Sequence, residues 1–154
     1  MLDFKSGSKF FEDNGKALVN AVSCDGTMDK GLSKLFAEKF PRIAEKHEQY
    51  CREGKIRKGV IWQYIAPNKL IINIPIREKS ADPVNKEYIR AAIDKLIENR
   101  HDRNWRSIAF PAVGVGDGTL SKKEALSILV EKLSMVDDVQ FRVYSSVESE
   151  KEYK

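Results

Sequence analysis

Two glycine-rich loops hold the residues whose types and spacing are best suited to chemistry. The first is Ser23-Cys-Asp-Gly-Thr-Met-Asp-Lys-Gly31 and the second is Val113-Gly-Val-Gly-Asp-Gly-Thr119. Each loop follows a short apolar run and leads directly into a predicted helix. Glycine lets backbone N–H groups turn towards an anion, and a helix N-terminus adds positive potential. Because a diphosphate needs donors on two sides, we expect the two loops to bind phosphate groups together.

Neither loop has the pattern of a nucleoside triphosphatase or of a dinucleotide-dependent dehydrogenase. The segment Gly114-Val-Gly-Asp-Gly118 lacks the Lys-Ser/Thr ending that contacts the terminal phosphates and Mg²⁺ in triphosphatases. It also lacks the glycine spacing of the dinucleotide fingerprint, and it lies late in the chain. Both classes of enzyme are therefore disfavoured.

Alternating strand and helix signals predict how these loops are positioned. Apolar spacing predicts helices at residues 30–40, 41–52, 83–97 and 121–133. Apolar and β-branched runs predict strands at residues 17–22, 60–65, 70–74, 107–110 and 139–144, and residues 2–5 could add an edge strand. The second and third of these runs are separated by Ala-Pro-Asn-Lys and predict a hairpin. This order predicts an α/β protein with a mixed sheet covered by helices, in which ligands bind at the carboxyl ends of strands.

Capping residues predict where the helices begin. Asp82 is expected as an N-cap that places Pro83 in the first turn. Asp29 is expected as the N-cap of the helix that starts at Lys30. The pattern Ser121-Lys-Lys-Glu124 predicts a capping box.

The chain has 154 residues, which suits one compact domain, predicted over residues 1–146 and followed by a polar tail at 147–154. The formal net charge of +4 hints at an anionic partner but does not establish one. The longest apolar runs are far below the roughly 18 residues of a membrane span, and the first residues lack the apolar segment of a secretory signal. Two cysteines exclude a disulfide framework, so we expect a reducing, cytoplasmic location.

The residues around both loops resemble a known family, the macrodomains. Ala17-Leu-Val-Asn-Ala-Val22 followed by Cys24-x-Gly-x-Met-x-Lys-Gly-Leu32 is similar to their first ligand loop. Ile108-Ala-Phe-Pro-Ala-Val-Gly-Val-Gly-Asp-Gly118 is similar to their second. The resemblance extends over residues 7–144, and it is strongest to the branch with terminal ADP-ribose protein glycohydrolase, the antitoxins that reverse DNA ADP-ribosylation and the ADP-ribose 1″-phosphate phosphatase. It implies a three-layer α/β/α fold with a central mixed β-sheet.

The resemblance implies that the ligand is ADP-ribose, free or in an ADP-ribosylated substrate. The first loop would border the distal ribose, and the second would surround the diphosphate. The implied binding residues are Asn20, Ser23, Cys24, Gly26, Met28, Lys30, Gly31, Pro111, Val113, Gly114, Val115, Gly116, Gly118 and Thr119. A monomer without cofactor, metal or membrane association is expected, and nucleic acid is expected only as an ADP-ribosylated substrate.

One departure from the family pattern concerns adenine. Many macrodomains have an aspartate near the end of the first strand that accepts a hydrogen bond from the adenine amino group. This chain has Lys9 there, and lysine cannot accept that bond. Glu12 or Asp13 could take over.

Two further departures shape the catalytic hypothesis. Arg77 stands where deribosylating members have a lysine, and because arginine stays protonated an amine nucleophile there is disfavoured. The acid of the second loop aligns with Gly118, and its neighbour Asp117 could act as a general base or only cap its own loop. We expect Asp117 or Asp25 to orient a water, and Arg77 or Lys79 to stabilise developing negative charge.

Other candidate residues favour structural roles. His47 and Cys51 have the i, i+4 spacing of a metal pair, but no further ligand lies near them in sequence. No histidine accompanies Cys24 in sequence, so a buried filler is favoured over a nucleophile. The basic clusters at 55–58 and 100–106 could contact nucleic acid, although interleaved acids favour a solvated face.

Three functions stay open. The first is an enzyme that hydrolyses ADP-ribose derivatives, with phosphatase activity slightly favoured over ADP-ribosyl hydrolase activity by the missing lysine and the shifted acid. The second is a binding module for ADP-ribose or a related nucleotide signal that turns nothing over. The third is a nucleic-acid-binding domain, for which the sequence lacks a combined aromatic and basic platform.

Overall fold

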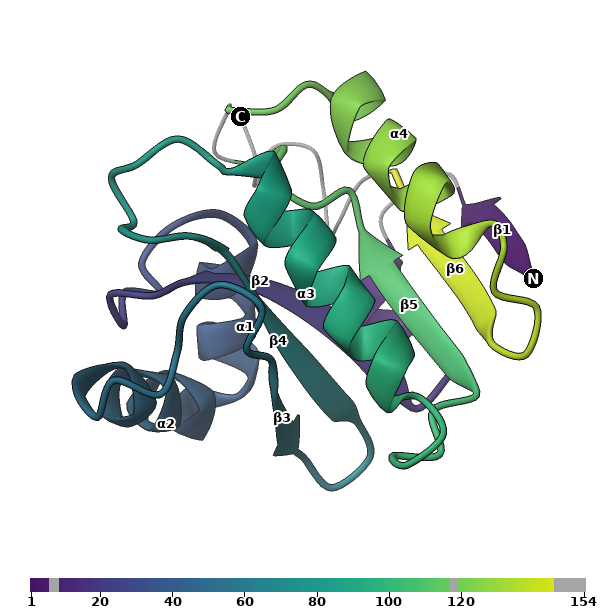
Figure 1. Ribbon diagram of the computed structural model, residues 1–154. Helices are drawn as coiled ribbons and strands as arrows, with labels where there is room; N and C mark the ends of the chain where they lie inside the picture. The colour runs from purple at the N-terminus through teal and green to yellow at the C-terminus, as the bar shows by residue number, and fades with distance from the viewer. Residues whose placement is uncertain (6–8, 117–118, 146–154) are drawn as a thin grey trace.

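The strands of this computed structural model form one mixed sheet in the order β1-β6-β5-β2-β4-β3 (Figure 1). The structure describes residues 1–5, 9–116 and 119–145. Its strands are β1 (Leu2–Lys5), β2 (Ala17–Ser23), β3 (Trp62–Ile65), β4 (Leu70–Arg77), β5 (Ser107–Pro111) and β6 (Gln140–Tyr144). Its helices are the short 3-10 helix η1 (Phe10–Glu12), α1 (Gly31–Lys39), α2 (Pro41–Arg52), α3 (Lys86–Asn99) and α4 (Lys122–Leu133). The predicted alternation, edge strand and hairpin are confirmed.

Parallel pairing places β2 in the interior of the sheet. β2 pairs in parallel with β4 on one side and β5 on the other, and every residue of β2 is buried. β3 is antiparallel to β4, and the two are joined by a tight turn in which Ala66 N–H donates to Lys69 O at 2.8 Å. Because β5, β2 and β4 are parallel neighbours, the loops that follow them leave the same edge of the sheet.

β4 continues past its predicted end at residue 74 to Arg77. Pro75 lies opposite Val22, and the register shifts between Val22 and Ser23. Proline has no N–H to donate to the ladder, and the bulge beside it accommodates this missing donor. The extension brings Arg77 to the carboxyl edge of the sheet.

Helices cover both faces of the sheet and give the three layers that the resemblance implies (Figure 1). α3 and α4 lie side by side over one face, linked by ion pairs between Arg90 and Glu131 at 3.1 Å and between Lys132 and Asp94 at 2.9 Å. On the other face α1 packs against β2, and α2 packs against α1. The core between the layers includes Phe36, Ile43, Ile72, Ile74, Ile89, Ile93, Leu96, Phe110, Leu129 and Phe141.

The start of α3 differs from the prediction. Asn85 is the N-cap, and its Oδ1 accepts hydrogen bonds from the N–H groups of Glu87 at 2.9 Å and Tyr88 at 3.3 Å. Asp82 instead closes a turn, where its Oδ2 accepts from Lys79 N–H at 3.0 Å. Because the Asp82 carboxylate bonds within the loop, it does not cap the helix, which begins later, after the side-chain amide of Asn85.

The start of α1 also differs from the prediction. Lys30 is the N-cap, with φ −152° and ψ 160°, and it makes no side-chain cap bond. Helical geometry therefore begins one position later than an Asp29 cap would require. The capping box of Ser121 and Glu124 at the start of α4 is confirmed.

Asp13 fixes the segment that enters β2. Its buried carboxylate accepts hydrogen bonds from Arg142 Nε and Nη2, both at 2.7 Å, and from Tyr144 Oη at 2.6 Å. Gly15 N–H donates at 2.8 Å. Burial alone would raise the pKa of Asp13, but these hydrogen bonds outweigh it and lower the pKa to about 2. With its acceptor capacity used inside the core, Asp13 is not placed to recognise adenine.

Replacing Asp13 by Asn tests this network. We expect Asp13→Asn to lower the free energy of unfolding by about 3 kcal/mol, because the largely buried Arg142 charge loses its counter-charge. Asp3→Asn is the matched control, since the exposed Asp3 carboxylate accepts from Gln140 Nε2 at 2.8 Å and its loss should change stability by less than about 0.5 kcal/mol. Urea unfolding at neutral pH measures both, and equal stabilities of the two variants would contradict the role given to Asp13.

Candidate functional site

Three loops leave the carboxyl edge of the sheet next to one another. They are the β2 loop (residues 24–30), the β4 loop (78–85) and the β5 loop (112–121), each named for the strand that it follows. Because β2 lies between β4 and β5, the β2 loop is flanked by the other two. The two glycine-rich loops predicted to bind phosphate therefore lie together, and the β4 loop, which contains Lys79 and follows Arg77, lies beside them.

The Asp25 carboxylate joins the β2 loop to the β4 loop. Its Oδ1 accepts from Ser23 Oγ at 2.6 Å and from Thr27 N–H at 3.0 Å, while its Oδ2 accepts from Ser80 N–H at 2.8 Å. Burial would raise the pKa of Asp25, but these bonds outweigh it and lower the pKa to about 2. Asp25 is therefore ionised at neutral pH and weakly basic. Its contacts are those of a clamp between loops, and its water-orienting role stays a prediction.

The peptide between Ser23 and Cys24 is held on both sides. Its N–H donates to the carbonyl oxygens of Arg77 at 3.1 Å and Glu78 at 2.9 Å, and its carbonyl oxygen lies 2.8 Å from His47 Nε2. Burial, with the nearby Glu78 carboxylate, raises the pKa of the Cys24 thiol to about 12. The thiol is therefore protonated at neutral pH, in agreement with the interpretation of Cys24 as a filler and not a nucleophile.

Arg77 lies at the root of the β4 loop. The side chain is partly buried, and its Nη1 donates to Asp82 O at 3.4 Å. Lys79 is exposed, and Tyr88 Oη donates to Glu78 Oε2 at 2.9 Å across the start of the loop. Of the two candidate cations, the Arg77 side chain is the less exposed and has a hydrogen bond within the β4 loop. Its guanidinium can bind an anion in a bidentate manner but cannot take up a proton.

The β5 loop is packed tightly against the β4 loop. Gly114 has φ +82°, and a Cβ there would lie 2.8 Å from Leu120 Cδ1 and 3.0 Å from Val84 Cγ1. Val84 N–H donates to Thr119 Oγ1 at 3.2 Å, and Leu120 N–H donates to Gly114 O at 3.1 Å. Glycine is needed at position 114 both for its backbone conformation and for this close approach.

Asn20 lies inside the sheet below the loops. It is fully buried, and its Nδ2 donates to Asn73 Oδ1 on β4 at 2.9 Å. Asn73 Nδ2 in turn donates to Trp62 O on β3 at 3.3 Å. Asn20 Oδ1 has no hydrogen-bond partner within the described residues. The two asparagines form a polar row that ties β2 to β4 and β4 to β3.

The other predicted binding residues follow the same strands. In the β2 loop, Met28 is buried, Gly26 has φ +86°, and Lys30 is exposed at the start of α1. The remaining described residues are Gly31, Pro111, Val113, Val115 and Gly116. Asp117 and Gly118 lie outside the described residues. The binding roles of all of these residues stay predictions.

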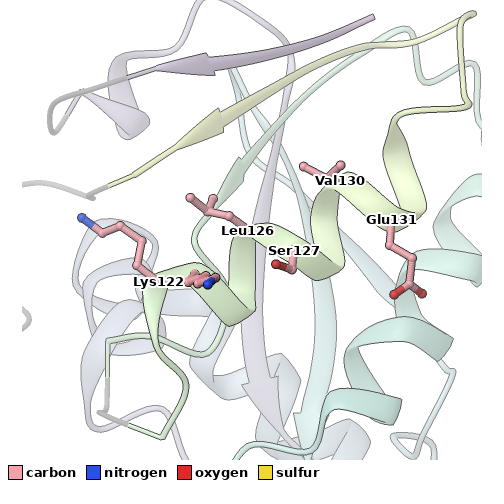
Figure 2. A pocket seen from close by; sticks show the side chains of 6 residues that line it. Lys122, Leu126, Ser127, Val130 and Glu131 are labelled. Carbon is pink, nitrogen blue, oxygen red and sulfur yellow. The ribbon is translucent and has the colours of Figure 1, made fainter.

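Metal-ligand clusters, helix length and surface hollows can be described for the part of the chain that the structure covers. It holds no cluster of three or more His, Cys, Asp or Glu side chains that could bind a metal ion. None of its helices is long and apolar enough to cross a membrane. A hollow of about 740 Å³ runs along α4, and no predicted binding residue is among its lining residues Lys122, Lys123, Leu126, Ser127, Val130 and Glu131 (Figure 2).

Known proteins give the family of this chain. The Macro domain profile matches residues 19–129, a range that includes both predicted ligand loops, and the chain belongs to this family. A Mycobacterium tuberculosis protein named DNA ADP-ribosyl glycohydrolase is 32% identical over 149 residues, which cover 94% of this chain and 42% of the relative. The solved macrodomain of Thermus aquaticus DarG is 30% identical with a TM-score of 0.85, covering 94% of this chain and 98% of that one.

An Aspergillus fumigatus ADP-ribose 1″-phosphate phosphatase is 33% identical over 46 residues, which cover 30% of this chain and 23% of the relative. The chain thus spans about 42% of the length of the curated glycohydrolase that it matches, but nearly all of the solved macrodomain. The family and the fold predicted from the sequence are confirmed.

The packing of the β5 loop can be tested by adding a methyl group at position 114. Gly114→Ala should lower the free energy of unfolding by about 2 to 4 kcal/mol, since alanine adds overpacking to the cost of a left-handed backbone. Gly54→Ala is the matched control: its φ is +72°, and nothing lies within 4 Å of the added Cβ, so only about 1 to 2 kcal/mol is expected. If thermal or urea unfolding shows the same loss for both variants, the close contact at Gly114 is not what requires glycine.

Proposed function

We propose that this chain releases ADP-ribose from an ADP-ribosylated nucleic acid by hydrolysing the bond between the anomeric carbon and the base. The proposal rests on one observation: the three loops at the carboxyl ends of β5, β2 and β4 are joined by hydrogen bonds, and Arg77 lies where the β4 loop begins. Such a cluster supplies backbone N–H donors for a diphosphate and a cation for developing negative charge.

The extent of similarity supports nucleic acid as the carrier. The protein named DNA ADP-ribosyl glycohydrolase matches 94% of this chain, whereas the phosphatase matches 30%. The departures of Arg77 and Gly118 from the family pattern favour the phosphatase slightly. The longer match includes every loop of the cluster, so it carries more weight.

Water is the proposed nucleophile. Its oxygen forms the new bond to the anomeric carbon as the bond from that carbon to the base breaks. The bonding electron pair leaves with the base, a carboxylate takes one proton from the attacking water, and the base regains a proton on release. The products are ADP-ribose and the restored base, so no oxidant, reductant or cofactor is needed.

The charged residues divide these tasks. Arg77 stabilises negative charge on the diphosphate or the departing base, and because its guanidinium stays protonated it does not form a covalent adduct. Asp25 is held as a clamp with a pKa of about 2, which makes it a weak base. Asp117 is therefore the proposed group that orients the attacking water, with Lys79 as a second cation at the rim.

Product analysis distinguishes the candidate reactions. The chain is incubated with a single-stranded oligonucleotide carrying ADP-ribose, with an ADP-ribosylated protein and with ADP-ribose 1″-phosphate, and the products are measured by liquid chromatography and mass spectrometry. We expect ADP-ribose to be released from the oligonucleotide fastest. Phosphate release from ADP-ribose 1″-phosphate alone would show that the chain is a phosphatase and that the proposal is wrong.

Substitution of Arg77 tests its electrostatic role. Arg77→Ala should lower kcat on the modified oligonucleotide by about 100-fold, the usual effect of removing one group that stabilises transition-state charge. Arg77→Lys keeps the charge and should retain more activity than Ala. Lys95→Ala is the control because Lys95 lies in the second half of α3, outside the loops and the basic clusters, and its Nζ is 3.5 Å from Glu98 Oε2. Unchanged kcat in Arg77→Ala would remove Arg77 from the mechanism.

A second candidate function is a binding module that does not turn ADP-ribose over. Arg77 in place of the family lysine favours it, because one catalytic route is closed. Calorimetric binding of ADP-ribose without release of product from any of the three substrates would support this function.

The domain limit at residue 146, a monomeric state and a cytoplasmic location are proposed on the sequence arguments alone.

A further inference from the structure

His47 has both ring nitrogens bound to fixed partners. The ring is fully buried on α2. Trp62 Nε1 lies 3.2 Å from Nδ1, and Ser23 O lies 2.8 Å from Nε2. An indole nitrogen can only donate a hydrogen bond and a carbonyl oxygen can only accept one. The ring must therefore be neutral, with its single proton on Nε2.

The partner of His47 on β2 is a peptide at an irregularity in the sheet ladder. The register shifts between Val22 and Ser23, next to Pro75. At this bulge the carbonyl of Ser23 accepts from His47, while the following N–H, that of Cys24, donates to main-chain carbonyls at the end of β4. Rotation of this peptide would break bonds on both sides, so His47 sets the direction in which the β2 loop leaves the sheet.

We propose that His47 is a positioning residue for the site: oriented by Trp62, it fixes the Ser23–Cys24 peptide and thereby the β2 loop and the main chain at Arg77. His47 is fully buried and would touch neither substrate nor reacting atoms. Its effect passes through the peptide to the Asp25 clamp on one side and to β4 on the other. The inference rests on the proposed function, since the site that His47 positions is the one to which that function is assigned.

Protonation of His47 would break this arrangement. α2 contributes Cys51, whose Sγ lies 3.6 Å from His47 Nε2, β3 contributes the uncharged Trp62, and the β2 loop contributes the Asp25 carboxylate. Burial lowers the pKa of His47 below 6.5 and outweighs the Ser23 carbonyl and Asp25, which raise it. A proton on Nδ1 would face the indole N–H, so the bond to Trp62 would be lost.

The sign of the pH dependence follows from this shift. Above the unfolded value of 6.5 the ring is neutral in both states, and its contribution to stability is complete. Below that pH the unfolded chain takes up a proton that the folded chain does not, so stability falls as the pH drops towards the folded pKa. Asp25, with a pKa of about 2, stays ionised throughout this range.

Two substitutions separate the hydrogen bonds of His47 from its titration. His47→Gln supplies a neutral donor and a neutral acceptor and does not titrate. His47→Leu removes both and leaves the Trp62 N–H and the Ser23 carbonyl without their partner. Leu133→Ala, which truncates a buried side chain at the last residue of α4, is the control for lost stability without a change at the site.

Binding of ADP-ribose and turnover of the modified oligonucleotide are then compared at about pH 7.5, where an unperturbed histidine is mostly neutral. We expect Kd to weaken about tenfold in His47→Leu and to stay within about threefold of wild type in His47→Gln and Leu133→Ala. Lowering the pH to about 5.5 should lower the free energy of unfolding of wild type more than that of His47→Gln, because only wild type has the His47 ring that takes up a proton on unfolding. A folded His47→Leu protein that binds and turns over like wild type would overturn the inference.

Amide hydrogen exchange tests His47 without any ligand. In His47→Leu we expect the amides of Cys24 and Thr27 to exchange about tenfold faster, while those of β6 keep their protection. If no variant binds ADP-ribose, the proposed function fails, and exchange alone decides the positioning role. Unchanged exchange at Cys24 and Thr27 would show that His47 does not hold the β2 loop.

Discussion

The parallel pairing of β2 between β4 and β5 is the constraint on which the site depends. Three parallel neighbours must release their following loops at the same edge, whatever the loop sequences are. Hydrogen bonds between the loops then join the three neighbouring loops to one another. Asp25 clamps the β2 loop to the β4 loop through Ser80, and the Val84 N–H bound to Thr119 Oγ1 joins the β4 loop to the β5 loop. A change in strand order would separate these groups, even if every loop residue were kept.

The local electrostatics of this edge suit an anionic ligand, although the net positive charge of the chain is small. The net charge of +4 is small for 154 residues and describes no particular surface. Backbone N–H groups at glycine-rich turns and the N-terminus of α1 supply local positive potential, and Arg77 and Lys79 add cations at the β4 loop. The Asp25 carboxylate stays ionised, and its charge is stabilised by hydrogen bonds from the N–H groups of Thr27 and Ser80 and the hydroxyl of Ser23, which hold its oxygen atoms between the loops.

Features encoded by neighbouring residues could be predicted from the sequence. The apolar run of β2, the turn before Leu70 and the capping box at Ser121 all rest on local spacing, and the structure has them. The N-caps at Asp29 and Asp82 were wrong because loop geometry and a competing turn decided the helix starts. Contacts such as Asp25 with Ser80, 55 residues apart, and His47 with Ser23, 24 residues apart, leave no local signal. The i, i+4 spacing of His47 and Cys51 also occurs in metal sites, but here His47 Nε2 is hydrogen-bonded to the carbonyl oxygen of Ser23.

The central claim is that the three joined loops form one ADP-ribose site. An NMR titration of the isotopically labelled chain with ADP-ribose tests it most directly, because each backbone amide reports separately. The largest shifts should fall on residues 24–30, 78–85 and 112–121, with little change along the outer face of α4 or at residues 100–106. Shifts concentrated in either of those two regions, with the three loops unaffected, would contradict the claim.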